Sequence, residues 1–216
     1  MENKEEIVSY LKNIKNGKVN CDLDVLNDEG EKIAILKPVI DSKLSDNSEI
    51  IRFITKWREY YAENFLTQFK VTEERTKNWL DTNLIKRDDK ILFMIETRDK
   101  KVIGHIGVIF KEDYSVGELD NVIKDKNCKV PRIMTYALKA LINFLFNFLE
   151  LEKLTLRVFS ENLNAQALYS RCGFSKDKEV GLKKEIIGEE VRYVEIGENE
   201  LLTPDKIMIV MNLEKN

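Results

Sequence analysis

The chain has 216 residues, of which 43% are hydrophobic and 34% are charged. A chain of this length and composition is able to fold around a core of its own, which excludes an intrinsically disordered protein. Its 35 basic and 38 acidic residues leave a net charge of −3, so no overall basic field indicates a nucleic-acid partner.

The cysteine spacing argues against a metal site. Cys21, Cys128 and Cys172 are widely separated and form no Cys-x-x-Cys pair or Cys/His cluster, so neither a disulfide framework nor a bound metal is predicted. The most apolar segment, residues 133–149, holds a lysine and an asparagine and falls short of a membrane span. Because the N-terminus also lacks the apolar run of a signal peptide, we expect a cytoplasmic protein with no membrane partner.

Hydrophobic periodicity divides the first part of the chain into helices and a hairpin. We expect a helix over residues 5–15, strands over 20–26 and 31–38, and helices over 48–65 and 72–84. Thr72 is expected to cap the last of these helices through its hydroxyl group.

The second part of the chain alternates strands with two helices. We expect strands over residues 91–96, 102–110 and 117–124, a helix over 133–149, a strand over 154–159, a helix over 162–171, and strands over 182–196 (broken at Gly188) and 206–213. The first three strands are predicted to form an antiparallel meander, and the strand 154–159 follows a helix and can therefore lie parallel to an earlier strand. This order predicts an α/β (α+β) fold with a mixed sheet of about seven strands flanked by helices. Residues 1–28 are expected to be an N-terminal helix-hairpin extension.

The loop 125–132 is a candidate anion site. It leads into the helix 133–149 and carries three cations, Lys126, Lys129 and Arg132. The start of a helix offers free backbone N–H groups and the positive end of the helix dipole, and both favour an anion. A phosphate-bearing ligand is one interpretation of this loop, and a solvated basic loop is the other.

The segment after strand 154–159 carries the most specific motif. Residues 160–174 read Ser-Glu-Asn-Leu-Asn-Ala-Gln-Ala-Leu-Tyr-Ser-Arg-Cys-Gly-Phe. This run resembles motif B of the GNAT acyl-CoA N-acyltransferase superfamily, Asn-x-x-Ala-x-x-Leu-Tyr-x-x-x-Gly-Phe. The matching residues are Asn162, Ala165, Leu168, Tyr169, Gly173 and Phe174. Residues 102–107 and 156–158 resemble two strands of the same superfamily, so the resemblance extends over residues 32–213.

The resemblance implies acetyl-CoA as co-substrate, no metal, and an acyl-CoA N-acyltransferase domain over residues 29–216. In the superfamily the pyrophosphate loop reads Gln/Arg-x-x-Gly-x-Gly/Ala, whereas here Arg132 and Met134 replace both glycines. The helix that follows resembles a branch associated with amino-sugar and surface-polysaccharide synthesis. By that analogy the acceptor is expected to be the primary amine of a small molecule, namely a nucleotide-linked amino sugar.

The same resemblance assigns a set of cofactor-binding residues along strand 117–124, the loop after it and the motif B helix. They are Val122, Ile123, Lys124, Lys129, Val130, Arg132, Ile133, Met134, Thr135, Asn162 and Tyr169. Asn162 has a second interpretation as a plain helix cap, and the two are compatible.

The resemblance implies that an amine attacks the thioester directly, without a covalent enzyme intermediate. Tyr169 matches the tyrosine that protonates the leaving thiolate, and the ordinary pKa of a phenol, about 10, is near enough to that of a thiol, about 8.5, for this transfer. The base stays open among His105, Glu118 and Asp120, with a water chain to bulk solvent as the alternative.

Four residues are candidate substrate contacts: Trp57, Tyr60, Tyr61 and Asn121. The aromatic residues lie on the helix expected to wall the acceptor site, and packing in the core is their alternative role. Two further functions remain open beside the small-molecule enzyme. One is a protein N-terminal or lysine acetyltransferase, and the other is a non-catalytic acyl-CoA-binding module that lacks the loop glycines. A homodimer is one option for the assembly.

Overall fold

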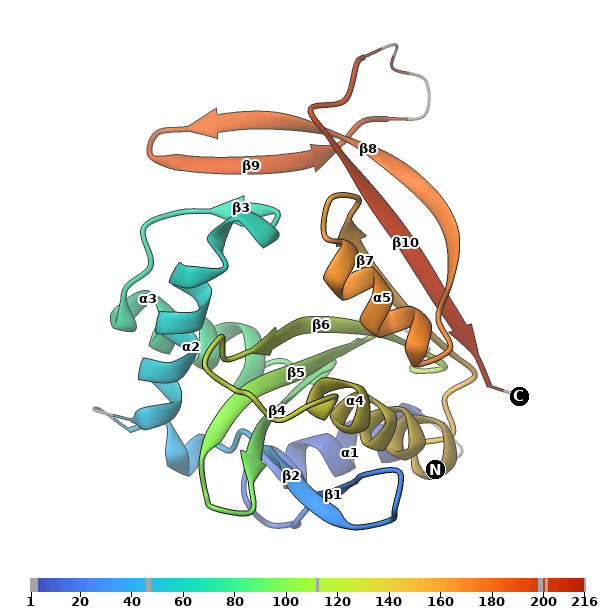
Figure 1. Cartoon of the computed structure of the whole chain (residues 1–216). Helices are drawn as coiled ribbons and strands as arrows, with labels where there is room; N and C mark the ends of the chain where they lie inside the picture. The colour runs from blue at the N-terminus through green and yellow to red at the C-terminus, as the bar shows by residue number, and fades with distance from the viewer. Residues whose placement is uncertain (1–3, 46–47, 112, 198–199, 201, 216) are drawn as a thin grey trace.

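The computed structural model describes residues 4–45, 48–111, 113–197, 200 and 202–215. In this part of the chain, ten strands form one mixed sheet in the order β1-β2-β4-β5-β6-β7-β10-β8-β9-β3. Helices lie against the sheet, and the β8–β9 hairpin arches over the top of the view in Figure 1 towards β3. No helix within the described ranges is long and apolar enough to cross a membrane.

The bounds of the elements follow the chain. The strands are β1 (Leu23–Leu26), β2 (Lys32–Pro38), β3 (Thr67–Gln68), β4 (Lys90–Thr97), β5 (Val102–Phe110), β6 (Val116–Lys124), β7 (Lys153–Phe159), β8 (Ser175–Ile187), β9 (Glu190–Glu195) and β10 (Lys206–Glu214). The helices are α1 (Lys4–Lys15), α2 (Glu49–Tyr60), α3 (Glu73–Leu80), α4 (Ile133–Asn143) and α5 (Leu163–Arg171). Short helical turns are η1 (Asp41–Lys43), η2 (Ala62–Asn64), η3 (Asp81–Ile85) and η4 (Phe144–Phe148).

The central strand β4 is buried on both faces, which explains its unbroken apolar run. Ile91, Phe93 and Ile95 belong to the core cluster that includes residues of α1 and α4. Leu92 and Met94 belong to the cluster that includes residues of α2 and α3. Because successive side chains of a strand point to opposite faces, the two clusters lie on either side of the sheet.

Several expectations from the sequence are confirmed. β4, β5 and β6 form the expected antiparallel meander, and β7 lies parallel to β6. The break at Gly188 separates β8 from β9, where this residue has a φ of 61°. Thr72 caps α3, because its hydroxyl oxygen accepts a hydrogen bond of 3.2 Å from the Arg75 N–H.

The expected seven strands were too few, for physical reasons. β8 begins at Ser175 rather than at residue 182. Its exposed first half is a charged run without apolar alternation, so the sequence did not indicate a strand there, and the segment is held by pairing with β10. β3 has two residues, too few to show a period. The helix expected over 48–65 ends at Tyr60 and gives way to η2, and the helix expected over 133–149 continues after Asn143 as η4.

The N-terminal segment packs into the main core. Ile7, Leu11 and Ile14 of α1 are at most 4% exposed and belong to the same cluster as α4. β1 pairs with β2, and the buried Lys15 donates hydrogen bonds to the carbonyls of Leu84 and Arg87. The division of the chain at residue 28 stays a prediction.

Strand β6 has two irregularities beside a gap in the sheet. β6 pairs with β7 only from Val116 to Leu119, and beyond this register each strand continues without the other. Between the β5 pairs of His105 and Gly107, β6 holds one extra residue, since their partners are Ile123 and Asp120. This is a β-bulge, and it changes the direction of the side chains beside the gap.

The bulge needs a left-handed residue on β6 and a close approach from β5. Asn121 has a φ of 50°, a conformation that asparagine adopts more readily than most residues. On β5, a Cβ atom added to Gly104 would lie 2.3 Å from the carbonyl oxygen of Ile123. Glycine is therefore required there for the two strands to approach each other.

Candidate active site

A cleft of about 1230 Å³ opens where β6 and β7 part. One side is formed by β6, β7, α5 and the beginning of α4. The other side is formed by α2, β3, α3 and Arg192 of β9, which the β8–β9 hairpin brings across to β3 (Figure 1). The residues that line the cleft thus come from several segments of the chain between residues 54 and 208.

Most of the residues indicated by the sequence line this cleft. They are Tyr61, Glu118, Asp120, Asn121, Val122, Ile123, Lys124, Val130, Arg132, Ile133, Met134, Thr135, Asn162 and Tyr169. Four others are placed elsewhere within the described structure. Lys129 is exposed on its loop and Tyr60 is 55% exposed, whereas Trp57 and His105 are buried between α2 and the sheet with ring centroids 5.7 Å apart.

The start of α4 keeps a glycine-like backbone without a glycine. Arg132 precedes the helix with φ 55° and ψ 9°, which is the left-handed conformation. Its guanidinium lies 2.6 Å from the Asp28 carboxylate, which also accepts a 2.8 Å hydrogen bond from the Tyr136 hydroxyl. These contacts accompany the left-handed backbone. Ile133, Met134 and Thr135 line the cleft, and the N–H groups of a first helical turn have no intrahelical partner.

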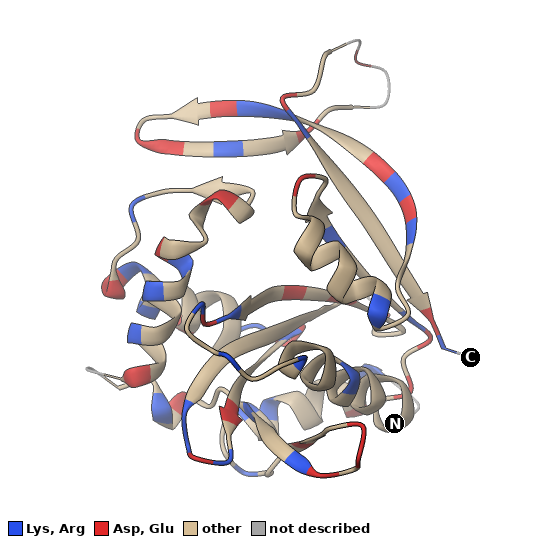
Figure 2. Cartoon of the chain, in the orientation of Figure 1, with Lys and Arg blue, Asp and Glu red and all other residues tan. Residues whose placement is uncertain are grey.

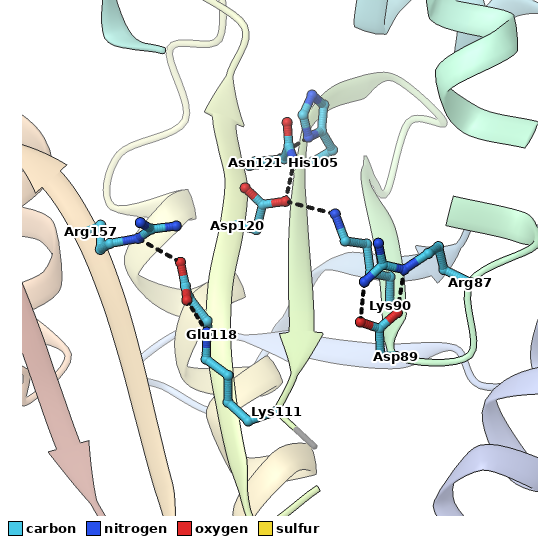
Figure 3. Close-up of polar contacts among 9 residues, drawn as sticks. All are labelled: Arg87, Asp89, Lys90, His105, Lys111, Glu118, Asp120, Asn121 and Arg157. Carbon is cyan, nitrogen blue, oxygen red and sulfur yellow. Dashed lines mark hydrogen bonds and ion pairs between the residues drawn. The ribbon is translucent and has the colours of Figure 1, made fainter. Parts of the chain in front are cut away.

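Glu118 is held as an ionised carboxylate by two cations. It accepts hydrogen bonds from Lys111 and from Arg157, whose Nε lies 2.9 Å from Oε1 (Figure 3). Burial alone would raise the pKa of this carboxyl, but the two cations outweigh burial and hold the pKa below its usual value. A carboxylate engaged in this way is a weak proton acceptor.

Asp120 has the opposite environment on the same strand. Burial raises the pKa of this carboxyl, although Lys90 lies 4.0 Å away and the Asn121 side chain donates a 2.5 Å hydrogen bond to it (Figure 3). The side chain is 35% exposed and lines the cleft. Asp120 therefore combines access to the cleft with a raised affinity for a proton.

His105 is buried behind the bulge. Its Nδ1 lies 2.7 Å from the carbonyl oxygen of Asn121, which can only accept, so Nδ1 carries the proton (Figure 3). Burial lowers the pKa of the ring to about 4, against the opposing effect of this hydrogen bond. The other nitrogen, Nε2, is buried without a hydrogen-bond partner in the described structure. His105 is neutral at pH 7 and holds the bulge by its Nδ1 contact.

The motif B helix contributes a tyrosine and a cap. Tyr169 is 7% exposed and lines the cleft, and burial first and the charge of Asp120 second raise its pKa. Asn162 accepts a 3.2 Å hydrogen bond from the Ala165 N–H and so caps α5. Tyr61, the residue after α2, donates a 2.9 Å hydrogen bond to the Lys124 carbonyl at the end of β6.

Sequence reasoning missed the residues of the far wall. Arg58, Phe65, Phe69, Arg75 and Arg192 all line the cleft. Phe65 was expected to end the helix over 48–65, and no glycine or proline marks the point where α2 ends. Phe69 lay outside every expected element. Arg192 lies on a hairpin far along the chain, and nothing in the sequence places it beside α3.

Cysteine and metal chemistry find no support in the site. Burial raises the pKa of the Cys172 thiol to about 11, so hardly any thiolate exists at neutral pH. Within the described ranges, no group of three or more His, Cys, Asp or Glu side chains is arranged to hold a metal ion.

These features define a class. A mixed sheet whose two parallel strands part beside a helix start, with a motif B helix on the same cleft, is the architecture of an acyl-CoA N-acyltransferase. The chain belongs to the GNAT acetyltransferase family, because the family model described as "Acetyltransferase (GNAT) domain" matches residues 39–175. It is an acetyl-CoA-dependent N-acetyltransferase, and acetyl-CoA is its co-substrate.

Solved structures share the fold. The spermidine N-acetyltransferase from Vibrio cholerae, solved with CoA and spermine, is 16% identical with a TM-score of 0.64, over 84% of this chain and 95% of that one. A chimera of the same Vibrio cholerae enzyme is 19% identical with a TM-score of 0.63, over 85% and 96%. A dodecameric form is 17% identical with a TM-score of 0.58, over 84% and 93%. No curated protein sequence matches the chain significantly.

Proposed function

We propose that this enzyme transfers the acetyl group to the primary amine of a small molecule, by direct attack of the amine within the cleft. The observation that supports the proposal is that Asp120 of β6 and Tyr169 of α5 line one cleft. They are close enough for the charge of Asp120 to contribute to the raised pKa of Tyr169. A proton acceptor on β6 and a proton donor on α5 thus line the same side of the cleft.

Asp120 acts as the base in this proposal. An amine is largely protonated at neutral pH and must lose a proton before it attacks. A carboxylate whose pKa is raised by burial accepts that proton more readily than Glu118, whose pKa is lowered by Lys111 and Arg157. His105 has no place in the cleft lining, and its free nitrogen is buried.

Tyr169 acts as the acid. Because its pKa is raised, the phenol stays protonated throughout the neutral and mildly alkaline range, which is the state a donor needs. The leaving group supplied by the co-substrate is a thiolate, and the phenol is the proton donor that we assign to it. Asp120 and Tyr169 together allow the proton taken from the amine to be balanced by one given to sulfur.

The donor is held at the other end of the cleft. The N–H groups of Ile133, Met134 and Thr135 at the start of α4, with Lys124 and Arg132 nearby, suit the phosphates of acetyl-CoA. Val122 and Ile123, after the bulge, and Asn162 suit its pantetheine arm. The left-handed backbone of Arg132 supports this assignment, because it is a conformation that glycine adopts most readily, and the superfamily pattern has a glycine at this position.

The acceptor is proposed only as a class. A nucleotide-linked amino sugar follows from the resemblance of the α4 sequence to an amino-sugar branch. A polyamine is the acceptor class of the structurally similar spermidine N-acetyltransferase from Vibrio cholerae. Both are small-molecule amines. A cytoplasmic location and a homodimer stay predictions.

The test is a pair of measurements on the purified full chain. Isothermal titration measures acetyl-CoA binding, and a thiol-release assay measures CoA production with a panel of amino sugars, nucleotide-linked amino sugars, amino acids, polyamines and peptides. We expect micromolar-range binding and amine-dependent thiol release above hydrolysis without amine. Binding without thiol release from any amine would instead indicate a non-catalytic acyl-CoA-binding module, and release only with peptides would indicate a protein acetyltransferase.

A further inference from the structure

The far wall of the cleft is unusually rich in guanidinium groups. α2, α3 and β9 contribute Arg58, Arg75 and Arg192 to the lining, and no acidic residue of these three elements is among the described lining residues. The carboxylates that do line the cleft, Glu118 and Asp120, both come from β6. Figure 2 shows both basic and acidic residues along α2 and α3.

Arg58 is held in place mainly by uncharged groups. Its guanidinium carbon lies 3.3 Å from the centre of the Phe65 ring and 5.4 Å from that of Phe69, and Nη2 donates a 2.7 Å hydrogen bond to the Thr67 carbonyl. Burial lowers its pKa to about 10, and the charge of Asp120 is the one that opposes this. A half-buried cation supported in this way keeps donors available for an incoming anion.

Arg75 and Arg192 share a single carboxylate. Arg75 Nη2 lies 2.6 Å from Glu190 Oε1, and Arg192 Nη2 lies 3.0 Å from Glu190 Oε2. Arg75 also stacks over the Phe69 ring, 4.2 Å from its centre. One carboxylate cannot neutralise two guanidinium groups, so this side of the cleft carries excess positive charge even after its ion pairs are counted.

We infer that the acceptor amine carries an anionic group, a carboxylate or a phosphate, which Arg58 and Arg75 bind while the amine faces Asp120. The inference rests on the proposed function and specifies its substrate class. Guanidinium groups bind carboxylate and phosphate oxygens through paired hydrogen bonds, and the stacked rings hold these two in fixed directions. A polycation such as spermidine would meet like charge on the same wall.

The experiment measures the binding of matched probes to the full chain saturated with CoA, which fills the donor's own phosphate site. Glucosamine 6-phosphate is compared with glucosamine, lysine with cadaverine, and spermidine is added as the polycation. We expect the anionic member of at least one pair to bind at least 10-fold more tightly than its partner and than spermidine. A preference within the glucosamine pair indicates a phosphate on the acceptor, and a preference within the lysine–cadaverine pair indicates a carboxylate.

Three variants locate the preference. Arg58→Gln combined with Arg75→Gln should abolish it, and Arg58→Lys, which keeps a cation, should retain most of it. Arg52→Gln is the matched control, because Arg52 lies on α2 with a side chain 52% exposed and is absent from the described lining. The paired probes are compared on the wild-type protein, so a folding defect of the double variant does not affect that comparison.

The outcomes separate the two proposals. If no pair shows a preference for its anionic member, or if spermidine binds as tightly, the inference about the acceptor is wrong. Thiol release is measured with the same amines and acetyl-CoA. Preferential binding of the anionic probes together with no acetyl transfer to any amine would overturn the proposed function while leaving the anion-binding wall in place.

Discussion

At the residue scale, three ionisable side chains near the bulge of β6 have different proton affinities because their surroundings differ. Lys111 and Arg157 keep Glu118 ionised, burial raises the pKa of Asp120, and burial lowers that of His105. Parity along the strand indicated that Glu118 and Asp120 share a face. It gave no means of choosing between them, because Arg157 comes from a neighbouring strand and Lys111 from the loop before β6.

Asp120→Asn tests the base. The wild-type value of kcat/KM should fall on the acid side as the carboxylate becomes protonated, and it should do so above the ordinary carboxyl pKa of about 3.9, because burial raises that of Asp120. The Asn variant should lose about 10²-fold or more in kcat/KM at neutral pH, together with this acid limb. Glu118→Gln should retain the limb. An acid limb that persists unchanged in the Asn variant would exclude Asp120 as the base.

Tyr169→Phe tests the acid. Removing the hydroxyl while keeping the ring should lower kcat by about 10²-fold and leave acetyl-CoA affinity unchanged. Tyr114→Phe is the matched control, since Tyr114 is equally buried, stacks on Phe110 and lies outside the cleft lining. Equal kcat values for the wild type and the Tyr169 variant, at neutral and alkaline pH, would assign this tyrosine to packing alone.

His105 should make stability depend on pH. Its pKa is 6.5 when unfolded and about 4 when folded, so the unfolded chain binds more protons between these values and stability is lost as pH falls through them. The full difference corresponds to about 3 kcal/mol of unfolding free energy. Urea unfolding at pH 7 and pH 4.5 measures most of it, and His105→Gln should show a correspondingly smaller decrease. Parallel decreases in the two proteins would refute the burial argument.

At the element scale, the sequence predicted the segments with strong periods and missed those defined by pairing. β5 matched its expected bounds, and α5 began and ended within a residue of expectation, because capping and glycine signals frame it. The first half of β8 is exposed and charged, so only its neighbour β10 makes it a strand. The bulge at Asn121 depends on pairing across β5 and β6 and leaves no local period.

The same distinction applies to the residues of the candidate site. Motif B and the helix start at Arg132 were found from sequence, because the residues that define them are consecutive or regularly spaced. The arginine wall was missed, because it assembles from α2, α3 and β9. Arg132 replaces a glycine of the family pattern, and its backbone is nevertheless left-handed. Its side chain forms an ion pair with Asp28.

Leu11→Ala tests whether α1 is part of the main core. Leu11 is fully buried in the cluster that also holds α4, and truncating such a side chain costs about 2–5 kcal/mol of unfolding free energy. Lys12→Ala is the control on the same helix, since its ion pair with Asp88 is about half exposed and should contribute about 1 kcal/mol at most. A cost below about 1 kcal/mol for Leu11→Ala would mean that α1 is a dispensable extension.

At the scale of the whole molecule, one sheet supports both ends of the cleft. The core strands fix β6, the parting of β6 and β7 opens one side of the cleft, and the β8–β9 hairpin reaches β3 to complete the other side. In the proposed function, the first side binds the donor and the second binds the acceptor. Burial raises the pKa of the Cys21 and Cys172 thiols, which therefore stay protonated at neutral pH. The proposed direct attack of the amine predicts that no acetyl-enzyme forms.

The acetyl balance of a single turnover tests this account most directly. Enzyme in excess over isotopically labelled acetyl-CoA is mixed with the best acceptor amine, and mass spectrometry follows the label in the protein and in the small molecules. Direct transfer predicts one N-acetylated amine for each CoA released, with no label on the protein at any time. Label that appears first on the protein and then on the amine, or CoA release without any acetylated amine, would contradict it.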